Sequence, residues 1–201
     1  MKKFELTNEF VTNSYGAKLF RIKALITLPS VKAGELGGYI EKEGNLSQYG
    51  NAWIYGNAWV SDDARVSDDA RVSGNALVCG DAQISGDAWV SDDARVSGNA
   101  RVSGNALVCG DAQISSDARV SDDALVCGNE DYAYAHGFGS RNRTTTFFRL
   151  RDGGVGVRCG CFYGTLAQFR DKVRETHKET KKAQEYLMLA DLMEFRFKKT
   201  F

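Results

Sequence analysis

The sequence predicts a mainly β protein whose central part is a parallel β-helix, and two regularities predict it. Ala recurs at every sixth residue from Ala52 to Ala124, and Val or Ile follows two residues after each Ala, from Ile54 to Val126. Residues two apart point to the same side of a strand, and the Gly-Asn, Gly-Asp, Ser-Asp and Asp-Asp pairs that complete the hexads tolerate tight corners. Each hexad is therefore a short strand and a corner, which is the repeat unit of a parallel β-helix.

The repeat divides the chain into three predicted parts. We expect a capping segment at residues 1–35, the β-helix at 36–130, and a separate module at 131–201. A column of stacked strands leaves an unpaired edge at each end, and each edge needs a cap. Within the capping segment, Tyr15-Gly16 marks a turn and residues 19–26 form a strand pattern.

Charge is distributed unevenly along a chain whose formal net charge is zero. Residues 51–129 contain twelve Asp and five Arg, whereas residues 130–201 contain fourteen Lys or Arg and nine Asp or Glu. The sequence therefore places a basic C-terminal module on an acidic rod. Basic modules often bind phosphates, so the charge pattern directs attention to this end of the chain.

The remaining composition predicts a cytoplasmic protein that does not enter a membrane. No stretch is long and apolar enough to span a bilayer, and the N-terminus MKKFELTNEF lacks the apolar core of a signal peptide. The five cysteines are odd in number, and three of them occupy rod positions otherwise held by Ser. We therefore expect no disulfide framework and a reducing compartment.

The repeat also resembles a known family. Residues 51–86, NAWIYGNAWVSDDARVSDDARVSGNALVCGDAQISG, resemble the YdcK-like hexapeptide-repeat β-solenoids of bacteria and prophages, and the resemblance extends over residues 36–130. It implies a single-stranded, left-handed β-helix with three hexads per coil. The winding comes from the resemblance alone, since the usual handedness rule for parallel strands points the other way.

With three hexads per coil, residues eighteen apart stack about 4.8 Å apart on one face. One face is polar and is expected to be solvated, and it consists of Arg65, Gln83, Arg101 and Arg119. A second face carries outward-pointing apolar residues, here named the Trp/Leu strip, which consists of Trp53, Trp89, Leu107 and Leu125. Such a strip needs a cover. We expect the C-terminal helices or a second copy of the chain, as a homodimer or homotrimer, with a ligand surface as the alternative.

The C-terminal module has the pattern of two strands followed by two helices. We predict a strand at residues 144–151, a hairpin turn at 152–154 and a returning strand at 155–162. Thr165 with Gln168 matches a capping box, which opens a helix that continues to about residue 177. The apolar face of a second helix follows, and it consists of Ala183, Tyr186, Leu187, Ala190, Met193 and Phe197.

Residues 137–146 are the strongest candidate for a ligand site. Gly lets backbone N–H groups approach a ligand, Ser and Thr hydroxyls donate hydrogen bonds, and Arg offers a bidentate fork for phosphate. In the strand that follows, Arg143, Arg149 and Arg151 are separated from Phe147 by even numbers of residues, so their side chains point to the same face as its ring. An aromatic ring among guanidiniums suits a nucleobase. The predicted phosphate-binding residues are Ser140, Arg141, Asn142, Arg143, Thr144, Thr145, Thr146, Phe147, Arg149 and Arg151. The competing interpretation is a connecting loop whose arginines pair with Asp at the rod's corners.

Neither a metal site nor a catalytic site is predicted. Many left-handed hexapeptide proteins are acyltransferases with a catalytic His, but the sequence has no His between residues 40 and 135. The Asp-Asp corners lack the spacing of calcium repeats. Cys159 and Cys161 share a strand face, yet zinc would need two further ligands and only His136 and His177 are available. A Cys/His nucleophile pair lacks an orienting third group.

The sequence therefore favours a non-enzymatic, oligomeric binding protein, without a cofactor, whose basic module captures a phosphorylated ligand such as a nucleotide. The prophage resemblance suggests one version, a counter-defence protein that sequesters a host nucleotide signal. Two alternatives stay open. One is an inhibitor that uses the acidic rod to bind a host protein or to mimic DNA, and the other is a sugar or nucleotide transferase or hydrolase using the C-terminal Cys, His and Arg residues.

Overall fold

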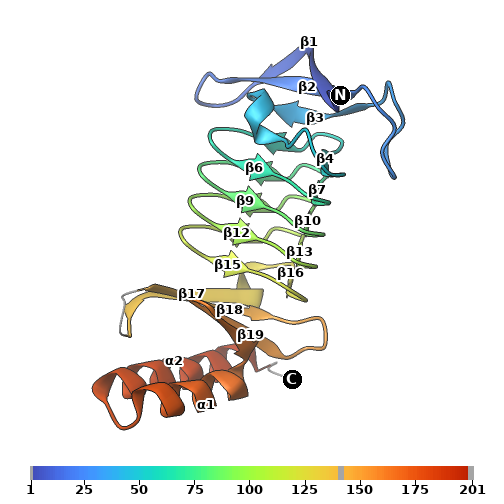
Figure 1. Cartoon of the computed structure of the whole chain (residues 1–201). Coiled ribbons are helices and arrows are strands. Elements are labelled where there is room, and N and C mark those ends of the chain that lie inside the picture. The colour runs from blue at the N-terminus through green and yellow to red at the C-terminus, as the bar shows by residue number, and fades with distance from the viewer. Residues whose placement is uncertain (1, 140–142, 199–201) are drawn as a thin grey trace.

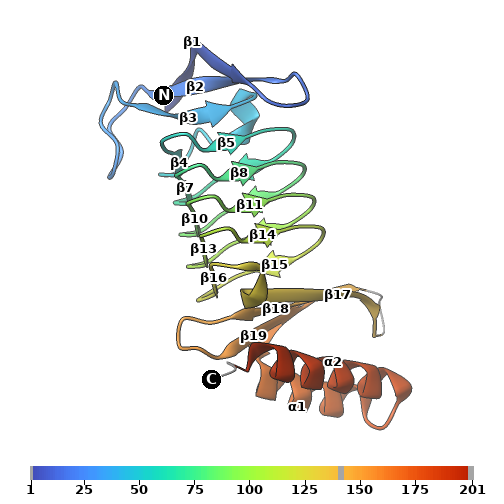
Figure 2. The ribbon, with the colours of Figure 1, turned by 180° about the vertical axis from the view of Figure 1, so that it is seen from behind.

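The computed structural model describes residues 2–139 and 143–198. Figure 1 shows a column of stacked coils with an antiparallel sheet at the N-terminal end and a sheet backed by two helices at the C-terminal end. Figure 2, seen from behind, shows the same three layers in the same order. The parallel β-solenoid and the small C-terminal α+β module predicted from the sequence are therefore confirmed.

Three parallel sheets form the walls of the rod, and each hexad contributes one two-residue strand. Arg101 pairs with Gln83 and Arg119, eighteen residues away on either side, which confirms three hexads per coil. The first sheet contains β4 (Trp53–Ile54), β7 (Arg71–Val72), β10 (Trp89–Val90), β13 (Leu107–Val108) and β16 (Leu125–Val126). The second contains β5 (Trp59–Val60), β8 (Leu77–Val78), β11 (Arg95–Val96) and β14 (Gln113–Ile114). The third contains β6 (Arg65–Val66), β9 (Gln83–Ile84), β12 (Arg101–Val102) and β15 (Arg119–Val120).

The core of the rod consists of the repeated Ala and β-branched residues. Every Ala from Ala52 to Ala124 is fully buried, as is every Val or Ile that follows it. Val96 and Val102 are buried, whereas Arg101, the residue before Val102 in β12, is exposed. This is the alternation that a strand predicts. Small and β-branched side chains fill the narrow interior because the three sheets approach closely.

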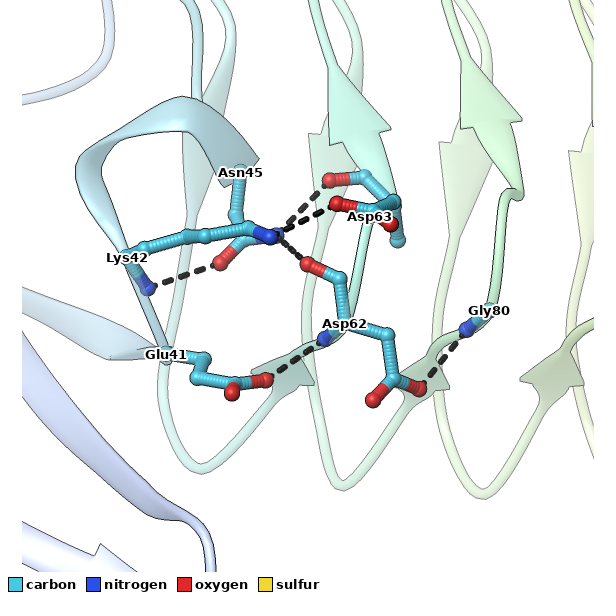
Figure 3. A network of polar contacts seen from close by, with 7 residues as sticks. Glu41, Lys42, Asn45, Asp62, Asp63 and Gly80 are labelled. Carbon is cyan, nitrogen blue, oxygen red and sulfur yellow. Dashed lines mark hydrogen bonds and ion pairs between the residues drawn. The ribbon is translucent and has the colours of Figure 1, made fainter.

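The Asp corners have a structural role that the sequence pattern did not reveal. Asp62 adopts a positive φ of 57°, and its carboxylate accepts a hydrogen bond from the N–H of Gly80, one coil further on, at 2.9 Å (Figure 3). The neighbouring corner position forms a second ladder, in which Asn75 donates to Asp93 and Asn99 donates to Asp117. These polar bonds join successive coils outside the core.

The N-terminal cap is an antiparallel sheet that continues a wall of the rod. It contains β1 (Phe4–Thr12), β2 (Lys18–Ala24) and β3 (Leu36–Ile40), and β3 pairs in parallel with β5. A 3-10 turn, η1 (Glu43–Asn45), follows β3. Its last residue, the fully buried Asn45, donates its side-chain amide to the carbonyl of Asp62 (Figure 3) and to that of Ala64. The strand predicted at residues 19–26 is confirmed as β2.

The C-terminal module is an antiparallel sheet between the rod and two helices. Its strands are β17 (Tyr132–Phe138), β18 (Arg143–Arg149), β19 (Val155–Cys159) and β20 (Phe162–Thr165), preceded by the 3-10 turn η2 (Asn129–Asp131). The helices are α1 (Leu166–His177) and α2 (Lys181–Phe197). Phe148 belongs to the core of the rod, whereas Phe147 belongs to the core beneath the helices.

Two elements of this module differ from the prediction. The strand β17 was not predicted, because its alternation of Tyr and Ala gives a weak apolar signal. The single returning strand predicted at residues 155–162 is two strands, since Gly160 at a φ of +62° turns the chain between β19 and β20. The capping box is confirmed: Thr165 accepts from the N–H of Gln168, and the Gln168 side chain accepts from the N–H of Thr165.

One expectation about the first wall is corrected, and one of the two covers expected for its Trp/Leu strip is not found. Cys109 and Cys127 form a disulfide, because positions eighteen apart are brought to a Cα–Cα distance of 4.3 Å by the coil spacing. The C-terminal helices do not cover the Trp/Leu strip, since they lie at the end of the rod (Figure 2). Instead, Phe4 of the cap packs against Trp53, while Trp89 remains 45% exposed and Leu107 and Leu125 are half-buried.

Candidate functional site

The described residues of the candidate stretch at 137–146 belong mostly to two paired strands, since residues 137–138 end β17 and residues 143–146 begin the antiparallel β18. Ser140, Arg141 and Asn142 lie outside the described residues. On their N-terminal side, Gly139 has a φ of +73° and faces the Tyr186 side chain so closely that a Cβ would clash with it. On their C-terminal side, Arg143 begins β18.

The hydroxyl residues of β18 bind the protein itself. Thr146 is buried, and its hydroxyl accepts a hydrogen bond from the N–H of Arg119 at 2.9 Å, which satisfies a backbone donor at the end of the rod. Thr145 is also buried and donates to the Cys159 sulfur at 3.2 Å. Thr144 is half-buried and bonds to His136 Nδ1 at 2.9 Å. The expectation that Thr145 and Thr146 contact a ligand is therefore corrected.

Phe147 is corrected for the same reason. It is fully buried beneath the helices, and its ring meets Phe169 edge to face with the centroids 6.0 Å apart. A central strand covered on one side by the rod and on the other by helices has no face left for a nucleobase. The parity argument placed Phe147 correctly with the odd-numbered residues of β18, but these residues point toward α1 and α2.

Two of the predicted arginines anchor the module. Arg149 Nε lies 3.0 Å from the Asp131 carboxylate, Arg149 Nη2 donates to the Phe197 carbonyl, and the guanidinium lies over the Phe197 ring. Arg151 donates to the carbonyl of Asn105, a corner of the rod, at 2.8 Å. Both arginines thus hold the module to neighbouring elements, as a connecting role predicts, but through Asp131 of η2 and the Asn105 carbonyl and not through the Asp corners that the competing interpretation named.

Arg143 is different, because it is exposed and lines a cavity of about 450 Å³ between the sheet and α1. Lys172 and His177 of α1 line the same cavity, so its rim carries basic groups from two elements. The aromatic residues of the lining are Phe162, Phe169 and Tyr186. A cavity of this size with an apolar wall and few polar groups has the character of a small-molecule site.

The α1 residues of this cavity were not predicted from the sequence. Phe169, Lys172, Val173 and Thr176 line it and recur at the spacing of one helical stripe. A Lys and a Thr beside the apolar face of α1 were the available signal. It is weak, because a basic residue at the border of an amphipathic helix is common.

Two thiols line the cavity, and one of them, Cys159, is held by its neighbours. Cys159 accepts a hydrogen bond from Thr145 and lies 3.7 Å from the Tyr186 hydroxyl. Burial raises the pKa of Tyr186, and the neighbouring Cys159 raises it further, so this phenol stays protonated at neutral pH. It donates to the Phe138 carbonyl at 3.4 Å, and the His177 ring lies against it with the centroids 5.7 Å apart.

The described residues do not form a metal centre. No group of three His, Cys, Asp or Glu side chains within residues 2–139 and 143–198 is arranged to hold a metal ion. Cys161 and His177 line one cavity with Cys159, but no hydrogen bond between a thiol and His177 is found among these residues.

Comparison with known proteins identifies the rod. A family model described as the YdcK β-solenoid repeat matches residues 64–80, 94–110 and 112–128. The chain is a YdcK-like β-solenoid protein. A search of curated proteins found no match.

The match to the YdcK-like repeat lies within the coils and ends before η2. The cavity lined by Arg143 and Lys172 therefore belongs to a part of this YdcK-like protein that the family model does not cover.

Among residues 2–139 and 143–198, no helix is long and apolar enough to cross a membrane.

Proposed function

We propose that this protein is a non-enzymatic binding protein that captures a phosphorylated, nucleotide-like ligand in the cavity of its C-terminal module. One observation carries the proposal: Arg143 and Lys172 stand at the rim of a cavity whose wall contains Phe162, Phe169 and Tyr186. Guanidinium and ammonium groups bind phosphate, and aromatic rings offer stacking or edge contacts to a base. The two chemistries of a nucleotide are met in one place.

Among the described residues, neither basic group is held in a buried ion pair. Lys172 pairs with Glu175 at 2.8 Å, but both side chains are more than half exposed, and such pairs contribute little. Arg143 is exposed, and its guanidinium lies 3.4 Å from the position that a Cβ on Gly160 would occupy. Glycine at residue 160 thus leaves space beside the guanidinium as well as turning the chain.

The test is a binding titration of the full chain against a panel of nucleoside mono-, di- and triphosphates. Arg143→Ala should weaken binding about ten-fold or more, because a charge-assisted bond to phosphate contributes roughly 1.5–3 kcal/mol. The matched control is Arg174→Ala, which removes an exposed arginine of α1 that pairs with Asp171. If no phosphorylated compound binds the wild type, capture in this cavity is excluded.

The prophage resemblance suggests the biological form of this proposal, in which a phage-encoded protein sequesters a nucleotide signal of host defence. Mass spectrometry of small molecules released from protein purified out of its host tests this version directly. A nucleotide recovered from the wild type and missing from the Arg143→Ala variant supports it. A host protein recovered in place of a nucleotide supports the rival, in which the acidic rod is the binding surface.

A transferase or hydrolase remains the second candidate because Cys159, Cys161 and His177 line the same cavity. Turnover of a bound nucleotide that is lost in Cys161→Ser would favour it. Capture without turnover predicts that the compound released from the protein is chemically intact.

A further inference from the structure

The wall formed by β6, β9, β12 and β15 carries a column of basic residues. Arg65, Arg101 and Arg119 are exposed and point outward from successive strands of this wall, with Gln83 in the remaining place. Arg101 and Arg119 are register partners, so their Cα atoms lie about 4.8 Å apart. Among the described residues, none of these arginines forms an ion pair with a carboxylate.

A series of cavities connects this column to the C-terminal module. Arg65 lines one cavity, Arg101 and Arg119 line the next together with Arg158 of β19, and the two share Gln83. A further cavity is lined by both Arg119 and Arg143. Arg143 in turn lines the aromatic cavity of the proposed site. The column and that site are therefore neighbours.

We propose that this basic column, continued by Arg158 and Arg143, is the phosphate track of a short single-stranded oligonucleotide whose terminal base enters the aromatic cavity. The inference rests on the proposed function of that cavity, and it specifies the ligand: an oligonucleotide with several phosphates.

Charge and spacing favour this occupant. Three coil steps separate Arg65 from Arg119, which is about 14 Å at the spacing of parallel strands. Phosphates along one strand of stacked DNA rise about 3.4 Å per nucleotide, so the column spans roughly four of them. Asp117 is the one carboxylate among the described residues that line these rod cavities, and it accepts a hydrogen bond from Asn99. Four serines flank the arginines. Ser85 and Ser103 offer hydroxyl donors to phosphate oxygens, whereas the hydroxyls of Ser67 and Ser121 donate to Asp68 and Asp122.

The single-stranded form follows from the aromatic cavity. A duplex keeps its bases stacked inside, whereas a single strand can place a terminal base against Phe162 or Tyr186. A bare polyphosphate chain would use the arginines but leave this aromatic surface without a partner. A second copy of the acidic rod is the competing occupant of the column.

The experiment measures fluorescence anisotropy of labelled oligothymidylates of one, two, four and eight nucleotides with the full chain. Affinity should rise at least about ten-fold from one to four nucleotides and then level off, as the column is filled. The double variant R101Q/R119Q should lose most of this gain and reduce the salt dependence of binding, while the affinity for the mononucleotide stays unchanged. The matched control is R71Q/R95Q, which makes the same charge change at the same hexad position on the other two walls.

The possible results separate this inference from the proposed function. Equal affinities for one and for eight nucleotides, with binding lost in Arg143→Ala, would overturn the track and leave the cavity proposal intact. Binding that increases with length but ignores Arg143→Ala would reject the cavity and overturn the continuation of the track through Arg143, leaving only the column on the rod. Equal competition by inorganic polyphosphate would overturn the oligonucleotide assignment. A change of particle mass in R101Q/R119Q without a change in nucleotide binding would assign the column to contacts between copies of the chain.

Discussion

Asp92 and Gly110 occupy the same corner of successive coils, and the Asp92 carboxylate accepts a hydrogen bond from the Gly110 N–H at 3.1 Å. Asp92 has a φ of 60°, a conformation that most residues other than Gly avoid. The bond to the next coil compensates for the strained backbone. The same relationship joins Asp68 to Gly86 at 3.1 Å.

We expect Asp92→Ala to destabilise the rod by about 1–2 kcal/mol, because it removes the carboxylate while a side chain at positive φ remains. Asp92→Gly should cost less, since Gly adopts this φ without strain. Urea unfolding of the two variants measures the difference. Asp111→Ala, at an exposed corner position, is the control. Equal stability of Asp92→Ala and the wild type would show that the bond contributes nothing.

Val96→Asp should destabilise the protein by at least about 3 kcal/mol, because it places a carboxylate without a partner in the interior of the rod. Val96 is fully buried and pairs in register with Val78 and Ile114. Arg95→Asp, one residue away on the outer surface, should have a small effect. Circular dichroism during thermal unfolding distinguishes the two, and a folded Val96→Asp protein would contradict the packing described here.

The rod was predictable in detail, whereas the site was predictable only in part, and the difference has a physical cause. Each hexad repeats the same local rule, so the burial of Val102 and the exposure of Arg101 follow from strand alternation and the period alone. Whether Phe147 is buried or exposed depends on which elements cover β18, and no local sequence pattern contains that information. Lys172 joins the cavity only because α1 folds back beside Gly160, a contact between distant parts of the module.

Lys3 gives the cap a dependence on pH. Its side chain is buried, donates to the Ala52 carbonyl at 2.9 Å, and burial lowers the pKa of Lys3 from 10.5 to about 8. Between these values the unfolded chain holds a proton that the folded chain has released, so the Lys3 contribution to stability rises with pH. Below about pH 8 both states are protonated and the cost of the buried charge is fully present.

The prediction is therefore a comparison of wild type with Lys3→Met by urea unfolding across pH 8 to 10.5. The free energy of unfolding of the wild type, measured relative to the variant, should increase with pH through this window. Subtraction removes the titration of the other lysines and tyrosines. Lys2→Met, whose side chain is 48% exposed, serves as the control. A difference that stays constant with pH would show that Lys3 titrates normally in the folded protein.

Arg149→Ala should destabilise the C-terminal module by about 2–3 kcal/mol, because it leaves the carboxylate of Asp131 partly buried without its partner. Both side chains are less than one-fifth exposed. Hydrogen exchange of α2 should report the loss, since Arg149 also binds the carbonyl of Phe197 at the end of that helix. Ligand affinity of the folded variant should match the wild type. An Arg149→Ala variant that is as stable as the wild type but no longer binds the ligand would show that Arg149 contributes to binding.

The exposed part of the Trp/Leu strip leads to the last prediction, self-association of the rod. Trp89 is 45% exposed, and its indole N–H donates to the hydroxyl of Ser73, so the ring lies along the wall and presents a face to solvent. With the half-buried Leu107 and Leu125 beside it, it forms an apolar surface on a flat sheet, which favours pairing with a second copy. Light scattering of the intact protein should give a mass above 22.1 kDa. Trp89→Gln, which places at residue 89 a residue found at the same hexad position of β9, should return the protein to the monomer mass without unfolding it. A wild-type protein that is monomeric at all concentrations would exclude this interface.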